Sequence, residues 1–144
     1  MMKPKEIRII CKALRALSIP ERRRVENLTL ASDSFMLAVL QDNSETAMCW
    51  LAEQDEQILG WSLIRWFPRD VFGRTGSYVS VFVDIAHRGH GLGKLLVRKA
   101  ISYAQEHEMR PWFYGASQEQ IDFYNACQVP PLHITVNPFF RKPP

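Results

Sequence analysis

The chain has 144 residues, of which 47% are hydrophobic and 23% are charged, and its formal net charge is +3. This balance excludes a disordered chain, and no apolar run approaches the roughly 20 residues of a membrane-spanning helix. The small positive charge gives no reason to expect nucleic-acid binding. We expect one domain over residues 1–144, since a chain of this length can bury a core without disulfides.

The cysteines indicate a reducing compartment. Cys11, Cys49 and Cys127 are odd in number and far apart, without the C-x-x-C spacing of a zinc or redox site. We interpret them as reduced, buried thiols, and we expect no bound metal. The stretch from Ile7 to Leu17 contains basic residues and lacks the apolar core of a signal peptide, so the expected location is the cytoplasm.

The chain begins with a predicted strand and a predicted helix. Residues 6–14 alternate apolar and polar side chains, as an edge strand does. Ser18 and Glu21 have the spacing of a capping box, which opens a helix that we expect to run to about Ala31. The inward face of this helix is expected to consist of Val25, Leu28 and Thr29.

Two segments of this half leave alternatives open. The three adjacent arginines at 22–24 predict a solvated face, and the alternative is a surface for an acidic protein or nucleic acid. Residues 35–40 form a continuous apolar run, which fits either a buried helix or a strand, and we prefer the helix.

A hairpin and a third strand follow. Residues 47–53 and 57–67 are rich in strand-forming side chains and flank a polar turn at 54–56. After a loop at 68–76, residues 77–83 predict a strand with two different faces. Val79, Val81 and Val83 share one face, and Tyr78, Ser80 and Phe82 share the other.

A glycine-rich turn joins this strand to the next helix. Gly89, Gly91 and Gly93 alternate along the turn, so backbone N–H groups can approach a ligand without a Cβ in the way. The start of a helix adds partial positive charge, and nearby cations extend it. These cations are His87, Arg88, His90, Lys94 and Arg98. The pattern predicts a cradle for a phosphate-bearing ligand, and the alternative is a tight turn with solvated charges.

Two common phosphate loops do not fit this turn. A dinucleotide-binding loop needs G-x-G-x-x-G and an acidic residue about 20 positions later, at the end of a second strand. The glycine spacing here differs, and the region about 20 positions later is expected to be the same helix or its end. A P-loop needs serine or threonine after its lysine, whereas Leu95 follows Lys94.

The C-terminal third predicts a helix, a strand, a second helix and a last strand. The first helix is expected to end near Glu108, where Arg110-Pro111 breaks the chain, and residues 112–114 form the strand. Ser117 and Gln120 again have capping-box spacing. They open a helix in which Ile121, Tyr124 and Cys127 share one side. Residues 132–136 predict the final strand, and 137–144 a loosely held tail.

The segment from Arg88 to Gly93 has the pattern R-x-x-G-x-G after a hydrophobic strand ending in Val83-Asp84. This pattern resembles the acetyl-CoA signature of the GCN5-related N-acetyltransferases, the GNAT family. A later segment at 116–124, ending in Phe123-Tyr124, is similar to the second motif of that family. Two motifs in the same order are more specific than either alone.

The resemblance implies an α/β fold with a mixed, mainly antiparallel central sheet and flanking helices. It implies acetyl-CoA as cosubstrate, held in a slot where the strands at 77–83 and 112–114 diverge. The segment around residues 35–40 would then help to form the acceptor pocket. The residues implied in cofactor binding are Phe82, Val83, Arg88, Gly89, His90, Gly91, Leu92, Gly93, Lys94 and Ser117.

The chemistry implied is direct attack of an amine on the thioester, with Tyr124 as the general acid that protonates the departing thiolate. The alternative is a tyrosine that only packs in the core. The acceptor would be an amine of a small molecule or a protein, and a homodimer is compatible with the family; neither a membrane nor nucleic acid is expected as a partner.

The sequence departs from the family pattern in three places. Ser117 stands where the second motif usually has asparagine, and the Gly-Phe that commonly follows the tyrosine is absent. The strand at 77–83 also carries no glutamate or histidine that could act as a base. Ser80, Tyr78, an ordered water and the more distant His133 remain candidates for relaying the proton. A module that binds CoA or a protein without turnover is the alternative function.

Overall fold

The computed structural model describes residues 6–30, 46–66, 75–115, 118–127 and 133–136. Its elements, in chain order, are β1 (Arg8–Ala13), the 3₁₀ turn η1 (Leu14–Ala16), α1 (Ile19–Leu30), β2 (Ala47–Gln54), β3 (Gln57–Trp66), β4 (Thr75–Val83), the 3₁₀ turn η2 (Ile85–His87), α3 (Leu92–Glu106), β5 (Met109–Gly115), α4 (Gln118–Ala126) and β6 (His133–Val136). The expected helix at 35–40 and most of the expected loop at 68–76 lie outside the described residues.

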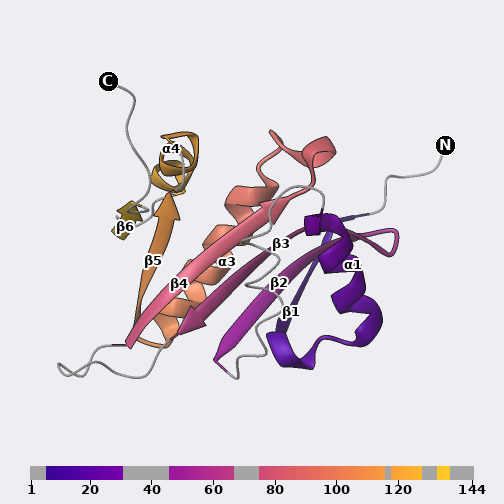
Figure 1. Ribbon diagram of the computed structural model, residues 1–144, viewed down its shortest axis with the longest axis horizontal. Coiled ribbons are helices and arrows are strands. Elements are labelled where there is room, and N and C mark those ends of the chain that lie inside the picture. Colours follow the sequence, from indigo (N-terminus) through magenta and orange to yellow (C-terminus); the bar gives the residue numbers. More distant parts are fainter. Residues whose placement is uncertain (1–5, 31–45, 67–74, 116–117, 128–132, 137–144) are drawn as a thin grey trace.

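The six strands form one sheet in the order of the sequence, from β1 at one edge to β6 at the other (Figure 1). β1 to β4 pair antiparallel, whereas β4 with β5 and β5 with β6 pair parallel. The predicted mixed, mainly antiparallel sheet with flanking helices is therefore confirmed. The predicted hairpin is also present, and its two turn residues, Asp55 and Glu56, have positive φ angles of 52° and 64°.

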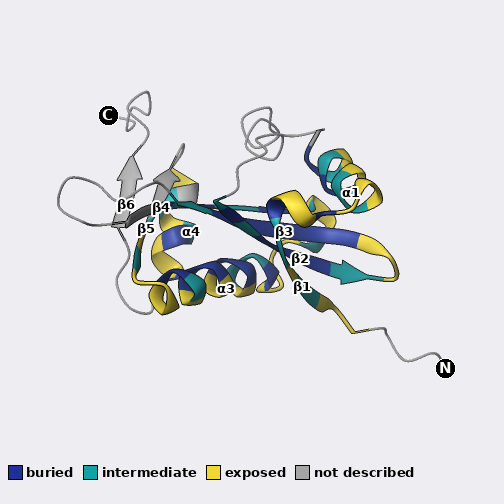
Figure 2. Ribbon diagram, turned by 90° about the horizontal axis from the view of Figure 1, so that it is seen from below, coloured by how far each residue is buried: buried dark blue, intermediate teal, exposed yellow. Residues whose placement is uncertain are grey.

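Helices cover both faces of the sheet, with α3 on one face and α1 on the other (Figure 2). Alternate residues of each strand point to opposite faces, and this divides the core into two clusters. Trp50, Val79 and Val83 pack with α3, whereas Trp61, Leu63 and Phe82 pack with α1. The predicted division of β4 into a valine face and an aromatic face is confirmed.

Three details of the sequence-based prediction are wrong. α3 ends at Glu106, and Arg110 and Pro111 lie inside β5 rather than breaking the chain. Pro111 is tolerated because it lies opposite Ser77 of β4 with its nitrogen turned away from β4, so the pairing of β4 with β5 needs no N–H group from it. The edge strand is also shorter than expected, because Leu14 belongs to the 3₁₀ turn η1.

The cysteines and the arginines of α1 differ in part from expectation. All three cysteines are free, but Cys11 is exposed because it lies on β1, the edge strand of the sheet, which has a neighbouring strand on one side only. Arg23 is exposed as predicted. Arg22 and Arg24 are half-buried instead, and donate hydrogen bonds to the carbonyl oxygens of Leu14 and Glu56, at 2.9 and 2.8 Å.

The start of α1 is fixed by the predicted capping box. The Ser18 backbone N–H donates to Oε1 of Glu21 at 2.9 Å, and the Glu21 N–H donates to Oγ of Ser18 at 3.2 Å. The Lys12 ammonium of β1 donates to both Glu21 oxygens, at 2.7 and 2.9 Å. The Lys12 bond, followed by the Ser18 bond, holds the pKa of Glu21 below its usual value.

Replacing Glu21 by glutamine is expected to lower the free energy of unfolding at pH 7 by about 1 kcal/mol, because three charge-assisted hydrogen bonds weaken. A carboxylate with a lowered folded-state pKa stabilises the protein above its unfolded pKa of about 4.3, and this contribution is lost as the pH falls through the folded-state pKa. The difference between the variant and the wild type should therefore shrink in acid. Urea unfolding at several pH values measures it, with Glu26→Gln as the control on the same helix; a difference independent of pH would contradict this account.

A buried hydrogen-bond chain ties the end of α1 to the sheet. The Trp61 indole N–H donates to Oγ1 of Thr29 at 3.0 Å, and the Thr29 hydroxyl donates to the carbonyl oxygen of Val25 at 2.8 Å. Thr29 and Trp61 are fully buried. Of the three positions expected to face inward, Val25 and Thr29 are buried in the core, and Leu28 is half-buried beside them.

Replacing Thr29 by valine is expected to lower the free energy of unfolding by about 1–3 kcal/mol, because the Trp61 N–H would remain buried without an acceptor. Urea unfolding measures the loss. Adding Trp61→Phe, which removes the donor, should cost less in the Thr29→Val background than in the wild type. Strictly additive effects of the two substitutions would contradict the importance of this hydrogen bond.

Candidate active site

β4 and β5 begin as a parallel pair and then separate. Their register runs from Thr75–Met109 to Val79–Phe113, while β4 continues to Val83 and β5 to Gly115. Figure 1 shows the two strands diverging toward the end at which α4 lies. The expected divergence of these strands is therefore present in the fold.

The last residues of β4 turn some of their peptide groups toward this opening. The Asp84 N–H donates to the Leu59 carbonyl oxygen of β3 at 2.8 Å, and the Phe82 carbonyl oxygen also faces β3, against Gly60. Because peptide groups alternate in direction along a strand, those of Val81 and Val83 face the opening. Buried peptide groups require partners, so this edge is a place where a ligand amide can pair.

Arg88 forms a hydrogen bond with one of these peptide groups. Its Nε donates to the Val83 carbonyl oxygen at 2.8 Å, and its guanidinium carbon lies 5.6 Å from the centre of the Phe82 ring. Phe82 and Val83 are themselves buried. Arg88 therefore anchors the glycine-rich turn to the end of β4, while the residue as a whole remains exposed.

Gly89 and Gly91 have the backbone that only glycine adopts easily. Their φ angles are +84° and +83°, and a Cβ at either position would meet no atom within 4 Å. Both are exposed. The turn thus combines a left-handed backbone with open space in front of it.

The first turn of α3 lacks the usual capping groups. Gly91 is the N-cap, so no side chain accepts a hydrogen bond there, and no acidic residue lies in the first turn. The first intrahelical bond joins the Leu95 N–H to the Gly91 carbonyl oxygen at 3.0 Å, which leaves the N–H groups of residues 92–94 without an acceptor in the helix. Lys94 adds a cation where the helix dipole disfavours one. An anion bound here would compensate both features.

The other predicted cations around this turn differ in how far they are exposed. His87 is held by Asp84, whose Oδ2 lies 3.1 Å from its Nδ1, and both side chains are partly exposed. His90 and Arg98 are exposed, and Lys94 is half-buried.

Gly93 differs from the other two glycines of the turn. A Cβ on Gly93 would lie 3.2 Å from Cζ of Phe123 and 3.5 Å from Cγ2 of Val83. Its lack of a side chain therefore lets α4 pack closely on the first turn of α3. Sequence reasoning missed Phe123, although it stands beside Tyr124 in the second motif.

Tyr124 is buried, with 6% of its surface exposed, in the core cluster that also contains Leu96 and Val97 of α3. Cys127 is buried on the same side and Ile121 is half-buried, so the predicted helical phase is confirmed. Burial raises the pKa of the Cys127 thiol, whereas the charges of Lys94 and Arg98 lower it. The end of α4 thus lies close to the first two turns of α3.

The sequence profile of the acetyltransferase (GNAT) family matches residues 13–127. The chain belongs to this family. The recognition made from Arg88–Gly93 and residues 116–124 is thereby confirmed.

Solved structures share the GNAT fold with this chain. A ribosomal-protein-alanine N-acetyltransferase from Brucella melitensis biovar Abortus 2308 is 22% identical, with a TM-score of 0.62, and the alignment covers 88% of this chain and 93% of that one. Glucosamine-6-phosphate N-acetyltransferase from Arabidopsis thaliana is 15% identical, with a TM-score of 0.65 and coverages of 93% and 99%. An aminoglycoside N-acetyltransferase in complex with CoA is 15% identical, with a TM-score of 0.65 and coverages of 98% and 99%. No curated protein matches the chain.

Two of the residues expected in the site, Ser117 and His133, have no described side chain. Ser117 lies outside the described residues. His133 lies in β6, opposite Trp112 in the register. Tyr78 and Ser80 are half-buried on the α1 side of β4.

Within the described part of the chain, no group of His, Cys, Asp and Glu is placed to hold a metal, and no helix is long and apolar enough to span a membrane.

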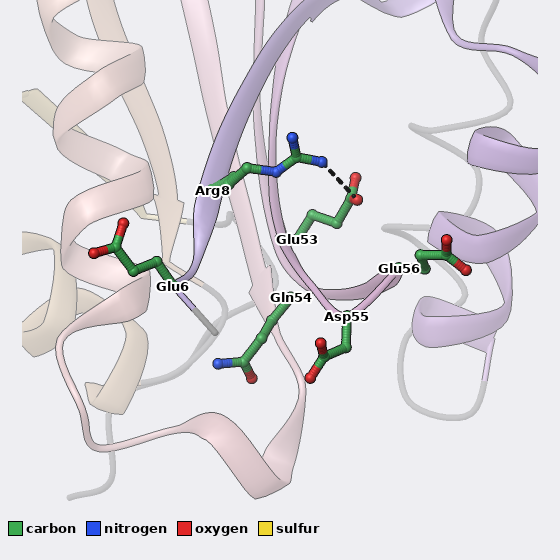
Figure 3. A pocket seen from close by; sticks show the side chains of 6 residues that line it. All are labelled: Glu6, Arg8, Glu53, Gln54, Asp55 and Glu56. Atoms are coloured by element: carbon green, nitrogen blue, oxygen red, sulfur yellow. Dashed lines mark hydrogen bonds and ion pairs between the residues drawn. The ribbon is translucent and has the colours of Figure 1, made fainter. Parts of the chain in front are cut away.

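One surface hollow lies elsewhere in this GNAT fold. It has a volume of about 440 Å³ and is lined by Glu6, Arg8, Glu53, Gln54, Asp55 and Glu56 (Figure 3). One of its carboxylates, Glu53, is paired with Arg8 at 3.1 Å. The hollow shares no residue with the glycine-rich turn, and its acidic lining is unsuited to a phosphate.

Proposed function

We propose that this protein is an N-acetyltransferase that moves the acetyl group of acetyl-CoA to an amine of a small molecule or a protein. The observation that carries the proposal is the uncapped, cationic N-terminus of α3, placed directly after the point where β4 and β5 diverge. The family membership supports acetyl transfer in general, and a structural neighbour is in complex with CoA.

In this proposal the pyrophosphate lies on the turn. The N–H groups of Leu92, Gly93 and Lys94 donate to phosphate oxygens, and the Lys94 ammonium neutralises charge. Arg88 keeps the hydrogen bond from its Nε to the Val83 carbonyl oxygen, and its terminal nitrogens donate to the ligand. Gly91 leaves space for the phosphates, with Gly89 and His90 at the rim. The Val81 peptide groups and the Val83 N–H that face the opening pair with the amides of the pantetheine arm, next to Phe82. Ser117 is proposed as a further cofactor contact.

The chain's own residues then assist the transfer. Acetyl-CoA supplies the thioester, and the amine nitrogen bonds to its carbonyl carbon as the carbon–sulfur bond breaks. Tyr124 donates its phenolic proton to the departing sulfur, whose pKa as a thiol is close enough to that of a phenol for efficient transfer. The proton lost by the nitrogen restores the phenol through solvent, so that an amide and free CoA leave.

The acceptor is proposed only as an amine. The neighbours named above act on a ribosomal protein, on glucosamine-6-phosphate and on aminoglycosides, and these three classes define the first acceptors to test. We further infer that residues 1–144 act as one domain in the cytoplasm, where the three free thiols remain reduced.

A thiol-release assay with acetyl-CoA across these amine classes tests the proposal, with the shift in Tm on adding CoA measured in parallel. Release above the background rate with one class, together with a raised Tm, supports the enzyme. A raised Tm with no release for any amine would favour the CoA-binding module instead. No change in Tm would contradict a CoA site on this chain.

A further inference from the structure

We propose that Gly93 and Phe123 form a joint that sets the position of Tyr124 relative to the cofactor turn. In this role Gly93 acts on the reaction through Phe123, as a positioning residue, and its missing side chain serves α4 rather than the phosphates. The inference rests on the proposed function, since it deepens the role of Tyr124.

The three glycines of the turn lack side chains for different reasons. Gly89 and Gly91 have positive φ angles and face open space, so their backbone conformation selects glycine. Gly93 lies inside α3, and its φ is outside the positive range. Glycine is a poor helix former, so a neighbour rather than the backbone must account for it at this position. That neighbour is the Phe123 ring, 3.2 Å from the place of a Cβ.

The space between Gly93 and Phe123 is too small for a methyl group unless the Phe123 ring moves. A Cβ at 3.2 Å from Cζ and 3.5 Å from Cε2 of Phe123 requires the ring to shift by a few tenths of an ångström, since carbon atoms prefer 3.5–4.0 Å. On its other side the Cβ would touch Cγ2 of Val83 at 3.5 Å, which blocks movement toward β4. The Phe123 ring, and α4 with it, must therefore move away from α3.

Phe123 and Tyr124 are consecutive residues of α4, which has only nine residues. Their ring centres lie 5.5 Å apart, and Tyr124 is buried while Phe123 is half-buried against the same cluster. The end of this short helix is also close to Lys94 and Arg98, whose charges reach the Cys127 thiol. A shift of Phe123 away from Gly93 thus moves Tyr124 relative to the turn that would hold acetyl-CoA.

Such a shift affects the proton transfer more than cofactor binding. A general acid acts within hydrogen-bond distance of its target, and a misplacement of about 1 Å can reduce a rate about 10²-fold. The backbone N–H of residue 93 stays in place when a methyl group is added. Gly93→Ala should therefore lower kcat by about 3- to 10-fold, for a shift of a few tenths of an ångström, and change the Kd of CoA by less than about twofold.

A double-variant cycle tests the joint. Leucine at 123 lacks the outer ring atoms Cε2 and Cζ that approach Gly93, so Phe123→Leu makes room for the new methyl group. We expect the Gly93→Ala, Phe123→Leu protein to recover kcat to within about threefold of the wild type, and to be faster than Gly93→Ala alone. Gly91→Ala is the matched control, because it adds the same methyl group two residues away, at a positive φ, and should raise the Kd of CoA instead.

Two results would overturn the proposal. If Gly93→Ala raised the Kd of CoA and Phe123→Leu gave no rescue, Gly93 would act at the phosphates. If Gly93→Ala changed only Tm, with kcat per folded molecule unaltered, the contact would be packing alone.

A readout without turnover separates this proposal from the proposed function. The protein is labelled with 3-fluorotyrosine, and the ¹⁹F resonance of Tyr124 is assigned by its loss in Tyr124→Phe. The joint predicts that this resonance moves in Gly93→Ala and returns toward its wild-type position in the double variant, even if no acceptor amine is found. An unmoved Tyr124 resonance in Gly93→Ala would overturn the joint, whereas absence of any acetyl transfer by the wild type would count against the proposed function.

Discussion

Replacing Tyr124 by phenylalanine is expected to lower kcat by about 10²- to 10⁴-fold while the Kd of acetyl-CoA changes little, because general acid catalysis contributes about that much. Tyr124 is buried beside Phe123 on α4, at the end of the sheet where β4 and β5 diverge (Figure 1). Steady-state kinetics with the acceptor found in the thiol-release assay measures kcat, and calorimetry measures Kd.

Tyr103→Phe is the matched control for this substitution. Tyr103 lies on α3, is half-buried, and packs between Trp50, Trp66 and His107 at the far end of the helix from the turn. Its loss should leave kcat unchanged. If Tyr124→Phe kept full turnover and only its Tm fell, Tyr124 would be a core residue, and the thiolate would take its proton from solvent or from another group.

Replacing Gly91 by valine is expected to raise the Kd of CoA by about 10²-fold or more, since each lost charge-assisted hydrogen bond costs about 1.5–3 kcal/mol. Gly91 is the N-cap of α3, and the space in front of it is open. A valine side chain would fill that space next to the N–H groups of residues 92–94. Calorimetric titration with CoA measures the loss of affinity.

Strain is the alternative cause of such a loss, because valine is disfavoured at positive φ. Gly89→Val is the control, since Gly89 has almost the same φ, +84° against +83°, but lies outside the helix cap. The two variants should lose similar amounts of thermal stability, and Gly91→Val should lose at least about tenfold more affinity for CoA. Equal losses of affinity in both would show that strain, not obstruction of the helix N-terminus, governs binding.

Local patterns predicted most of the described fold. The alternation in β4, the capping box of Ser18 and Glu21, and the hairpin around residues 54–56 are set by near neighbours in the chain, so short-range rules apply to them. The glycine spacing likewise indicated the turn before α3.

The incorrect predictions concern residues whose environment is set by segments far away in the sequence. Pro111 is expected to break the chain, but in the sheet its nitrogen is turned away from β4, so the pairing of β4 with β5 needs no N–H group from it. Cys11 is expected to be buried from its sequence context, but it lies on the edge strand of the sheet and is exposed. From the sequence, Gly93 is expected to be one of three equivalent loop glycines, but it packs against Phe123, 30 positions later in the chain. Neither composition nor periodicity contains these tertiary contacts.

The central claim is that the N-terminus of α3 binds the phosphates of CoA. The most direct measurement is a calorimetric titration of the wild-type protein with CoA and, separately, with pantetheine, which lacks the phosphates. Our account predicts one CoA bound per chain, weakened by added salt, with pantetheine binding at least about 100-fold more weakly. Equal affinities for CoA and pantetheine, or no binding of CoA, would contradict it.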